Sequence, residues 1–227
     1  PTGPLHVGHV RGAAYGDALA RILSATGSNV EKEYYVNDAG RQIDILTASV
    51  IMKMHESENS FFPQNAYKGK YIEDLGKKIE KKDNFNLTID KSILDSLSKD
   101  PEKEIDEIIS YLKNHCQAGW KTVKDFSLKS IIKDIKNDLR RFNVEFNNWF
   151  YESSLGSLDD GKSEISVAIN RLEENKQAYK KDGAIWLNTE DSGDDKHRVL
   201  VRDDGRATYF ASDVAYHKNK IDRGFDE

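Results

Sequence analysis

The chain opens with Pro1-Thr2-Gly3-Pro4-Leu5-His6-Val7-Gly8-His9, and this stretch is the strongest indication of the fold. Its prolines and glycine predict a stiff turn, and the apolar spacing from His9 to about Thr26 predicts a helix. The N-terminus of a helix favours phosphate because it carries unpaired N–H groups and partial positive charge. His6 and His9 share one face of the first turn, and Gly8 leaves room for a flat ring. We therefore expect His6, Gly8 and His9 to bind ATP, with His6 and His9 acting in catalysis.

Two histidines at this spacing also occur on protein surfaces without a function, or form half of a metal site. A zinc-binding helix of the usual kind carries a Glu between its histidines and needs a third ligand nearby. The sequence has neither around His6 and His9, so we predict no metal site here.

A second polar segment follows the next predicted strand. Residues 29–36 are rich in β-branched and aromatic side chains, and a helix is predicted from Ile43 to Met54 after the loop at Asn37-Asp38. Strand–helix alternation predicts a parallel sheet, and ligands of such sheets bind at the carboxyl ends of the strands. We therefore expect Asn37 and Asp38, with Gln42 one turn later, to line the same crevice as the histidines.

The remaining sequence predicts an interrupted domain. We assign residues 1–54 to the first part of a Rossmann-like catalytic domain, 55–142 to a helical insertion, 143–210 to a mixed, β-rich connective element and 211–227 to a return to the catalytic domain. The fold class is therefore α/β, a Rossmann-like parallel sheet interrupted by a helical insertion and a small β-rich element.

Several local signals refine this assignment. Asp100-Pro101 predicts the start of a helix that runs through Trp120, and a further helix is predicted from Val123 to Phe142. The segment 144–147 is predicted as strand, as are 149–151. Asp182-Gly183 and the later Asp203-Asp204-Gly205 each predict a hairpin, the second with Thr208-Tyr209-Phe210 as its returning strand. Ser212 is the predicted N-cap of a last helix that ends at Gly224.

Composition narrows the protein class. The chain has 227 residues, a formal net charge of −5 and one cysteine, Cys116, which excludes an intrachain disulfide and fits a reducing compartment. No run approaches the ~18 apolar residues of a membrane span. We expect a cytoplasmic monomer with no membrane partner.

Three segments together resemble the bacterial type of arginyl-tRNA synthetase, a class I aminoacyl-tRNA synthetase. They are the opening Pro-Thr-Gly-Pro-Leu-His-Val-Gly-His, the run from Glu33 to Gln42 (Glu-Tyr-Tyr-Val-Asn-Asp-Ala-Gly-Arg-Gln), and the run from Thr208 to Lys218. The resemblance implies the nucleotide-binding fold of class I synthetases. It also implies ATP-dependent activation of L-arginine to arginyl-AMP, transfer to tRNA(Arg), and Mg²⁺ accompanying ATP.

The resemblance also implies roles for two residues near the end of the chain. Asp213, in the first turn of the last helix, would face the guanidinium of arginine, and Tyr209, at the end of a strand, would contact its edge. The family's Asn before the Pro-Thr-Gly-Pro run and its second signature loop lie outside this sequence. We therefore expect a catalytic-domain fragment with little or no aminoacylation activity by itself.

Two other functions are compatible with parts of the sequence. A nucleotidylyltransferase also carries His-x-Gly-His, although such enzymes lack an interruption of this length. A non-catalytic tRNA-binding module would use the lysines of the helical segment, although the chain has no aromatic-basic RNA-binding signature.

Overall fold

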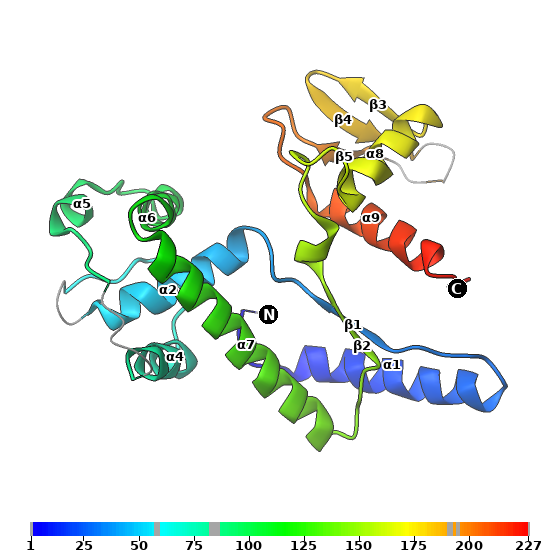
Figure 1. Cartoon of the computed structure of the whole chain (residues 1–227), viewed down its shortest axis with the longest axis horizontal. Helices are drawn as coiled ribbons and strands as arrows, with labels where there is room; N and C mark the ends of the chain where they lie inside the picture. Colours follow the sequence, from blue (N-terminus) through cyan, green and yellow to red (C-terminus); the bar gives the residue numbers. More distant parts are fainter. Residues whose placement is uncertain (1, 57–59, 82–86, 190–192, 194–195, 227) are drawn as a thin grey trace. The chain divides into compact units, whose positions relative to one another are not determined.

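We describe a computed structural model of the chain over residues 2–56, 60–81, 87–189, 193 and 196–226 (Figure 1). The first motif residue, Pro1, and Asp194-Asp195 lie outside these residues. The chain forms two compact units, Pro1–Trp149 and Phe150–Glu227. The secondary structure is mixed α/β, as predicted, with a two-stranded parallel sheet and a separate three-stranded antiparallel sheet.

The first unit is mainly helical. Its elements are α1 (Val7–Ala25), β1 (Glu33–Val36), α2 (Arg41–Met54), α4 (Lys70–Glu80), α5 (Lys91–Ser96), α6 (Pro101–His115), α7 (Gln117–Arg141) and the start of β2 (Asn148–Tyr151). The helix predicted from Ile43 to Met54 is confirmed as α2. The predicted helix start at Asp100-Pro101 is also confirmed, because the Asp100 side chain accepts the N–H of Glu102 as an N-cap.

Helix α2 is the centre of the first unit's core. Every residue from Ile43 to Met52 except Asp44 is buried, because α4, α6 and α7 pack around it (Figure 1). A helix that is apolar on all sides is expected in such a central position. Its buried hydroxyls are satisfied, since Thr47 and Ser49 each donate to the carbonyl four residues earlier. The packing of α4, α6 and α7 therefore holds α2 in position. The start of α2 follows the Asn37-Asp38 loop.

The predicted single helix through Trp120 is wrong. Cys116 ends α6 and precedes α7, with φ −130° and ψ 37°, so the chain bends there. The apolar stripe continues across the bend, because Leu112 and Trp120 are both buried in the same core. The apolar periodicity of the sequence is therefore continuous, although the helix is interrupted at Cys116. Burial raises the pKa of the half-buried Cys116 thiol.

The two-stranded sheet joins β1 to β2. The carbonyl of Lys32 accepts the N–H groups of Asn147 and Asn148 at 2.8 and 3.2 Å, and Tyr34 stacks on Trp149 with ring centroids 4.4 Å apart. The predicted strand at 29–36 is confirmed for Glu33–Val36 only. The predicted strand at 144–147 is wrong, because the Asn147 side chain accepts the Lys32 N–H and the ladder begins at Asn148.

The second unit packs two helices against a small sheet. Its elements are η1 (Glu152–Leu155), α8 (Glu164–Glu174), β3 (Ala178–Lys181), β4 (Ala184–Leu187), β5 (Arg198–Val201) and α9 (Tyr209–Asp222). The hairpin at Asp182-Gly183 is confirmed, with both turn residues at positive φ and β3 antiparallel to β4. Leu155, Leu200 and Ala211 are fully buried in this unit's core.

The returning strand of the second predicted hairpin is wrong. The turn forms, since the N–H of Gly205 donates to the Arg202 carbonyl, but pairing stops at a single bridge between Val201 and Ala207. Thr208 donates its hydroxyl to the Val199 carbonyl and its N–H to the Leu200 carbonyl. These bonds hold the chain beside β5, and the helix starts at the next residue.

The last helix therefore begins earlier than predicted. Tyr209 is the first residue of α9 instead of a strand end, Thr208 is the N-cap, and Ser212 lies buried within the helix instead of capping it. Asp213 is consequently beyond the first turn. The predicted helix end is confirmed, with Gly224 at φ 87° after the C-cap Arg223.

None of the helices in the described part of the chain combines the length and apolarity that crossing a bilayer requires. The division of the sequence into segments 1–54, 55–142, 143–210 and 211–227 stays a prediction.

Candidate functional site

The two signature histidines hold each other in place at the start of α1. The ring Nδ1 of His6 accepts the N–H of Gly8 at 3.2 Å, and the Nδ1 of His9 accepts the N–H of His6 at 3.3 Å. This is a reciprocal capping box in which imidazoles replace the usual hydroxyl and carboxylate. The rings also stack, with centroids 3.7 Å apart and an interplanar angle of 25°. Helix α1 therefore begins at Val7, two residues before the predicted start.

The capping pattern fixes which nitrogen of each ring carries a proton. A ring nitrogen that accepts an N–H bond is unprotonated, so a neutral imidazole in this position carries its proton on Nε2. Both rings are exposed, and each offers an Nε2–H donor from the helix N-terminus. The Gly8 N–H is already used by His6, so this backbone donor is not free for a ligand.

Gly8 allows the His6 ring to lie close to the backbone of α1. A Cβ built on Gly8 would lie 3.0 Å from Cε1 and 3.2 Å from Nδ1 of His6. The glycine therefore makes room for the capping ring of His6. The prediction that it makes room for a flat ring of ATP stays a prediction.

A pocket of about 500 Å³ lies beside the histidines and gathers several of the predicted site residues. The residues that line it are Thr2–Leu5, His6, His9, Tyr34, Tyr35, Asn37, Gln42, Tyr71 and Ile135. His6, His9, Asn37 and Gln42 therefore border one pocket, which agrees with our expectation that strand-end and helix-start residues share one crevice. Asp38 is half-buried and does not border it, and Gly8 borders a neighbouring apolar hollow along α1 together with His9.

The Asn37–Gln42 segment is shaped by a glycine. Gly40 has φ 79° and precedes α2, whose first residues are Arg41 and Gln42. The left-handed region favours glycine, so the backbone conformation at the start of α2 accounts for the glycine at position 40. No bound ligand is needed to explain it. The entry leaves the Gln42 side chain exposed at the pocket.

Two pocket residues come from the helical segment and were missed in the sequence. Tyr71 belongs to α4 and Ile135 to α7, both from the part of the chain to which we gave no site residue. A Cβ on Gly3 would lie 3.3 Å from Cζ and 3.4 Å from the hydroxyl oxygen of Tyr71. Burial raises the pKa of the Tyr71 phenol, so it stays protonated near neutral pH. The sequence signal for this contact was Gly3. A glycine permits another side chain to approach the backbone closely, but it does not identify which side chain does so.

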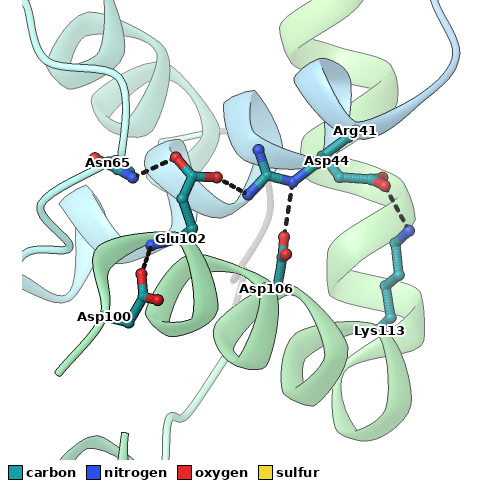
Figure 2. Close-up of polar contacts among 7 residues, drawn as sticks. All are labelled: Arg41, Asp44, Asn65, Asp100, Glu102, Asp106 and Lys113. Carbon is teal, nitrogen blue, oxygen red and sulfur yellow. Dashed lines mark hydrogen bonds and ion pairs between the residues drawn. The ribbon is translucent and has the colours of Figure 1, made fainter. Parts of the chain in front are cut away.

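A charged network ties the start of α2 to α6 (Figure 2). Arg41 donates to Glu102 at 2.7 Å and to Asp106 at 2.8 Å, and Glu102 also accepts from Asn65 at 2.7 Å. One turn further along α2, Asp44 pairs with Lys113 of α6 at 2.7 Å. Arg41 is the neighbour of Gln42, so these contacts help to hold that pocket residue in place.

A second set of ion pairs holds α1 against the chain that leads into β1. Asp17 is buried and accepts from Arg21 and Lys32, each at 2.6 Å. These two bonds, with the larger effect from Lys32, lower the pKa of the Asp17 carboxyl against the opposing effect of burial. Arg21 also donates to the carbonyl of Asn143 at 3.1 Å, so the histidine-bearing helix is tied to the segment after α7.

The two predicted arginine ligands of the second unit lie on α9. Tyr209 is exposed at the start of the helix, with its ring 4.6 Å from that of Phe210, and Asp213 is exposed one turn later. Residues at this spacing share a helix face, so the structure brings this pair together within its own unit.

No group of three or more His, Cys, Asp or Glu side chains within the described ranges is arranged to bind a metal ion. A Mg²⁺ ion that arrives with ATP would need no such group, because it takes ligands from phosphates and water.

Comparisons with known proteins identify the family over nearly the whole chain. The family model described as "tRNA synthetases class I (R), catalytic domain" matches residues 2–225. Arginine–tRNA ligases of Vesicomyosocius okutanii and Hydrogenovibrio crunogenus are 47% and 44% identical over the whole chain, which spans 40% of each relative's length. A crystal structure of an arginyl tRNA synthetase from Campylobacter jejuni is 33% identical with a TM-score of 0.74, covering 100% of this chain and 44% of that one.

Proposed function

Because the chain belongs to the catalytic-domain family of class I tRNA synthetases of the arginyl type, we propose that it works as part of an arginine–tRNA ligase. The ligase activates L-arginine with ATP to arginyl-AMP and transfers the arginyl group to tRNA(Arg). The family favours this function over a nucleotidylyltransferase or a non-catalytic tRNA-binding module.

The observation that carries the proposal is the pair of mutually capping histidines at the pocket. Their Nε2–H groups are donors at a helix N-terminus, where phosphate is favoured. His6 and His9 donate to the phosphates of ATP and to the charge that develops on the α-phosphate during the reaction. Gly8 keeps the His6 ring in place and completes the ATP site.

We assign the side chain of arginine to residues of α9, and the rest of the amino acid to the segment before α2 and the start of that helix. Arginine requires carboxylate and hydroxyl partners for its guanidinium, and Asp213 with Tyr209 supplies them. Asn37, Asp38 and Gln42 bind the rest of the amino acid. Asn37 and Gln42 border the same pocket as the histidines, which supports their part in this assignment.

The reaction needs no covalent bond to the protein. An oxygen of the arginine carboxylate attacks the α-phosphorus, the bond to the β-phosphate oxygen breaks, and pyrophosphate leaves. The protein aligns the two substrates and stabilises charge. Mg²⁺ accompanies ATP and neutralises phosphate charge. A hydroxyl of the terminal ribose of tRNA(Arg) then attacks the carbonyl carbon of arginyl-AMP, the bond to the phosphate oxygen breaks, and AMP leaves. The single cysteine and the family suit a cytoplasmic enzyme, which we propose to be a monomer.

ATP–pyrophosphate exchange in the complete ligase tests the proposal. With tRNA present, we expect exchange that depends on L-arginine and is not supported by L-lysine. Exchange without an amino-acid requirement, or tRNA binding with no exchange at all, would contradict it.

The donor role of the histidines can be tested separately from their capping role. His9→Asn keeps an acceptor for the His6 N–H but removes the Nε2–H donor, so we expect kcat to fall about 100-fold, as for loss of a donor to transition-state charge. His115→Asn is the control, because His115 is an exposed histidine at the end of α6 that bonds only to the Tyr111 carbonyl among the contacts described.

A further inference from the structure

We propose that the hydroxyl of Tyr71, from helix α4, donates a hydrogen bond to the α-carboxylate of the bound amino acid. This inference rests on the proposed function, because it assigns a residue of the helical segment to the arginine end of the same pocket.

The position of Tyr71 is the first support. Its side chain borders the pocket together with His6, His9 and Asn37, and its phenol end lies against Gly3 in the opening segment. The rest of the ring packs on the core of the first unit. The ring is therefore held in place, with its phenol end beside the opening segment that lines the pocket.

The hydrogen-bonding state of Tyr71 is the second support. Within the described residues we find no hydrogen bond from its hydroxyl, whereas the neighbouring buried hydroxyls of Thr47 and Ser49 are bonded. Burial keeps the phenol protonated, so it is a donor without a protein acceptor. A phenol hydroxyl in this state is available to donate to a ligand or to water.

The chemistry of the pocket wall identifies the ligand group. Among the described residues that border the pocket there is no Asp, Glu, Lys or Arg. A guanidinium would have no carboxylate partner there, whereas an anionic oxygen can be bound by neutral donors such as a phenol or an amide. The histidines are assigned to ATP. The remaining neutral donors of the wall are those of Tyr34, Tyr35, Asn37, Gln42 and Tyr71. We assign Tyr71 to the carboxylate because its phenol end lies against the opening segment, beside the histidines.

Tyr71→Phe in the complete ligase tests the inference, because it removes the hydroxyl and keeps the ring. We expect the KM for L-arginine in tRNA-dependent exchange to rise about tenfold, the usual effect of losing a hydrogen bond to a charged group. The KM for ATP should change less than about twofold by the same reasoning. Agmatine, which is arginine without its carboxylate, should inhibit the variant and the parent enzyme equally.

Tyr67→Phe is the matched control. Tyr67 is half-buried on the same core and close to Tyr71 but does not border the pocket, so its loss should leave both KM values unchanged. Gly3→Ala is a second probe, because the new Cβ presses on the Tyr71 phenol and should raise the KM for L-arginine as well.

Each other result has a defined meaning. An unchanged KM for L-arginine in Tyr71→Phe overturns the inference, and so does an equal loss of affinity for agmatine. A rise in the KM for ATP alone shows that the hydroxyl meets a phosphate and also overturns it. If the parent enzyme shows no arginine-dependent exchange, the proposed function itself fails, and this outcome is distinguishable because it does not involve the variants.

Discussion

Gly8 shows how a single missing side chain shapes the site. Gly8→Ala places a Cβ 3.0 Å from the His6 ring, so the ring must shift by a few tenths of an ångström and the cap is weakened. We expect the KM for ATP in the complete ligase to rise about tenfold. The melting temperature should change little, because the weakening of a cap worth about 1 kcal/mol is offset by the better helix propensity of alanine.

Gly16→Ala provides the control for that experiment. A Cβ on Gly16 meets nothing within 4 Å, so this change should stabilise α1 by about 0.5–1 kcal/mol and leave the KM for ATP unchanged. An unchanged KM in Gly8→Ala would show that the His6 position does not matter for ATP.

Asp17 makes the stability of the first unit depend on pH. Lys32 and Arg21 lower the pKa of its carboxyl below the ordinary value of 3.8. A lowered folded-state pKa means that the stabilisation is complete above the unfolded value and is lost as the pH falls through the folded value. We expect Asp17→Asn to lose about 1–2 kcal/mol at pH 7, allowing for the exposure of Arg21.

Denaturant unfolding at several pH values measures this effect. The difference in unfolding free energy between the parent chain and Asp17→Asn should be largest at pH 7 and shrink below about pH 4, where the carboxyl becomes protonated. A constant difference down to pH 2 would show that the charge on Asp17 is not its source.

At the residue scale the sequence predicted part of the lining of the pocket, and what these residues bind stays a prediction. His6, His9, Asn37 and Gln42 were identified because their types and positions at helix starts and strand ends carry a chemical signal. Tyr71 was not, since it reaches the pocket only through the packing of α4, and no local pattern reports that contact.

Helix α8 depends on a close contact with the preceding glycine. Gly156 has φ 78°, and a Cβ there would lie 2.6 Å from Cβ of Ser163, the N-cap of α8. We expect Gly156→Ala to lower the unfolding free energy by more than about 2 kcal/mol, through backbone strain and overlap with the cap. Gly161→Ala, where a Cβ meets nothing within 4 Å, should stay within about 0.5 kcal/mol of the parent in the same denaturation experiment. Equal stability of the two variants would contradict the contact.

The charged network between α2 and α6 predicts a salt-dependent effect. Arg41→Gln removes two exposed ion pairs, and Lys113→Gln removes one further along the same helices. Each should cost less than about 1 kcal/mol because exposed pairs are weak, and the cost should nearly vanish in 1 M salt. Only Arg41→Gln should also raise the KM for L-arginine in the complete ligase, because Arg41 precedes Gln42. Thermal melts at two salt concentrations measure the first effect, and equal KM changes in both variants would contradict the second.

At the element scale the sequence predicted most helices and the first hairpin, but it did not predict some of the boundaries between elements. The bend at Cys116 carries no glycine or proline, and apolar spacing continues through it. The start of α9 at Tyr209 was hidden because Thr208-Tyr209-Phe210 has strand-forming side chains, while the hydrogen bonds of Thr208 to β5 set the real boundary. Such boundaries depend on contacts with distant residues.

At the scale of the whole molecule, the chain spans about two fifths of the length of the ligases that it matches. The α/β class and the family followed from sequence motifs alone, and both are confirmed. The chain by itself is expected to give little or no pyrophosphate exchange. Robust exchange by the isolated chain would contradict that expectation.

The central proposal is that His6 and His9 bind the phosphate of the arginyl-adenylate and that Asp213 binds its guanidinium. A crystal structure of the complete ligase with a non-hydrolysable arginyl-adenylate analogue tests it most directly. We predict that the phosphate lies within hydrogen-bond distance of Nε2 of His6 or His9 and that the guanidinium contacts the carboxylate of Asp213. An analogue bound elsewhere, or one that contacts the histidines while Asp213 lies far from the guanidinium, would contradict the account.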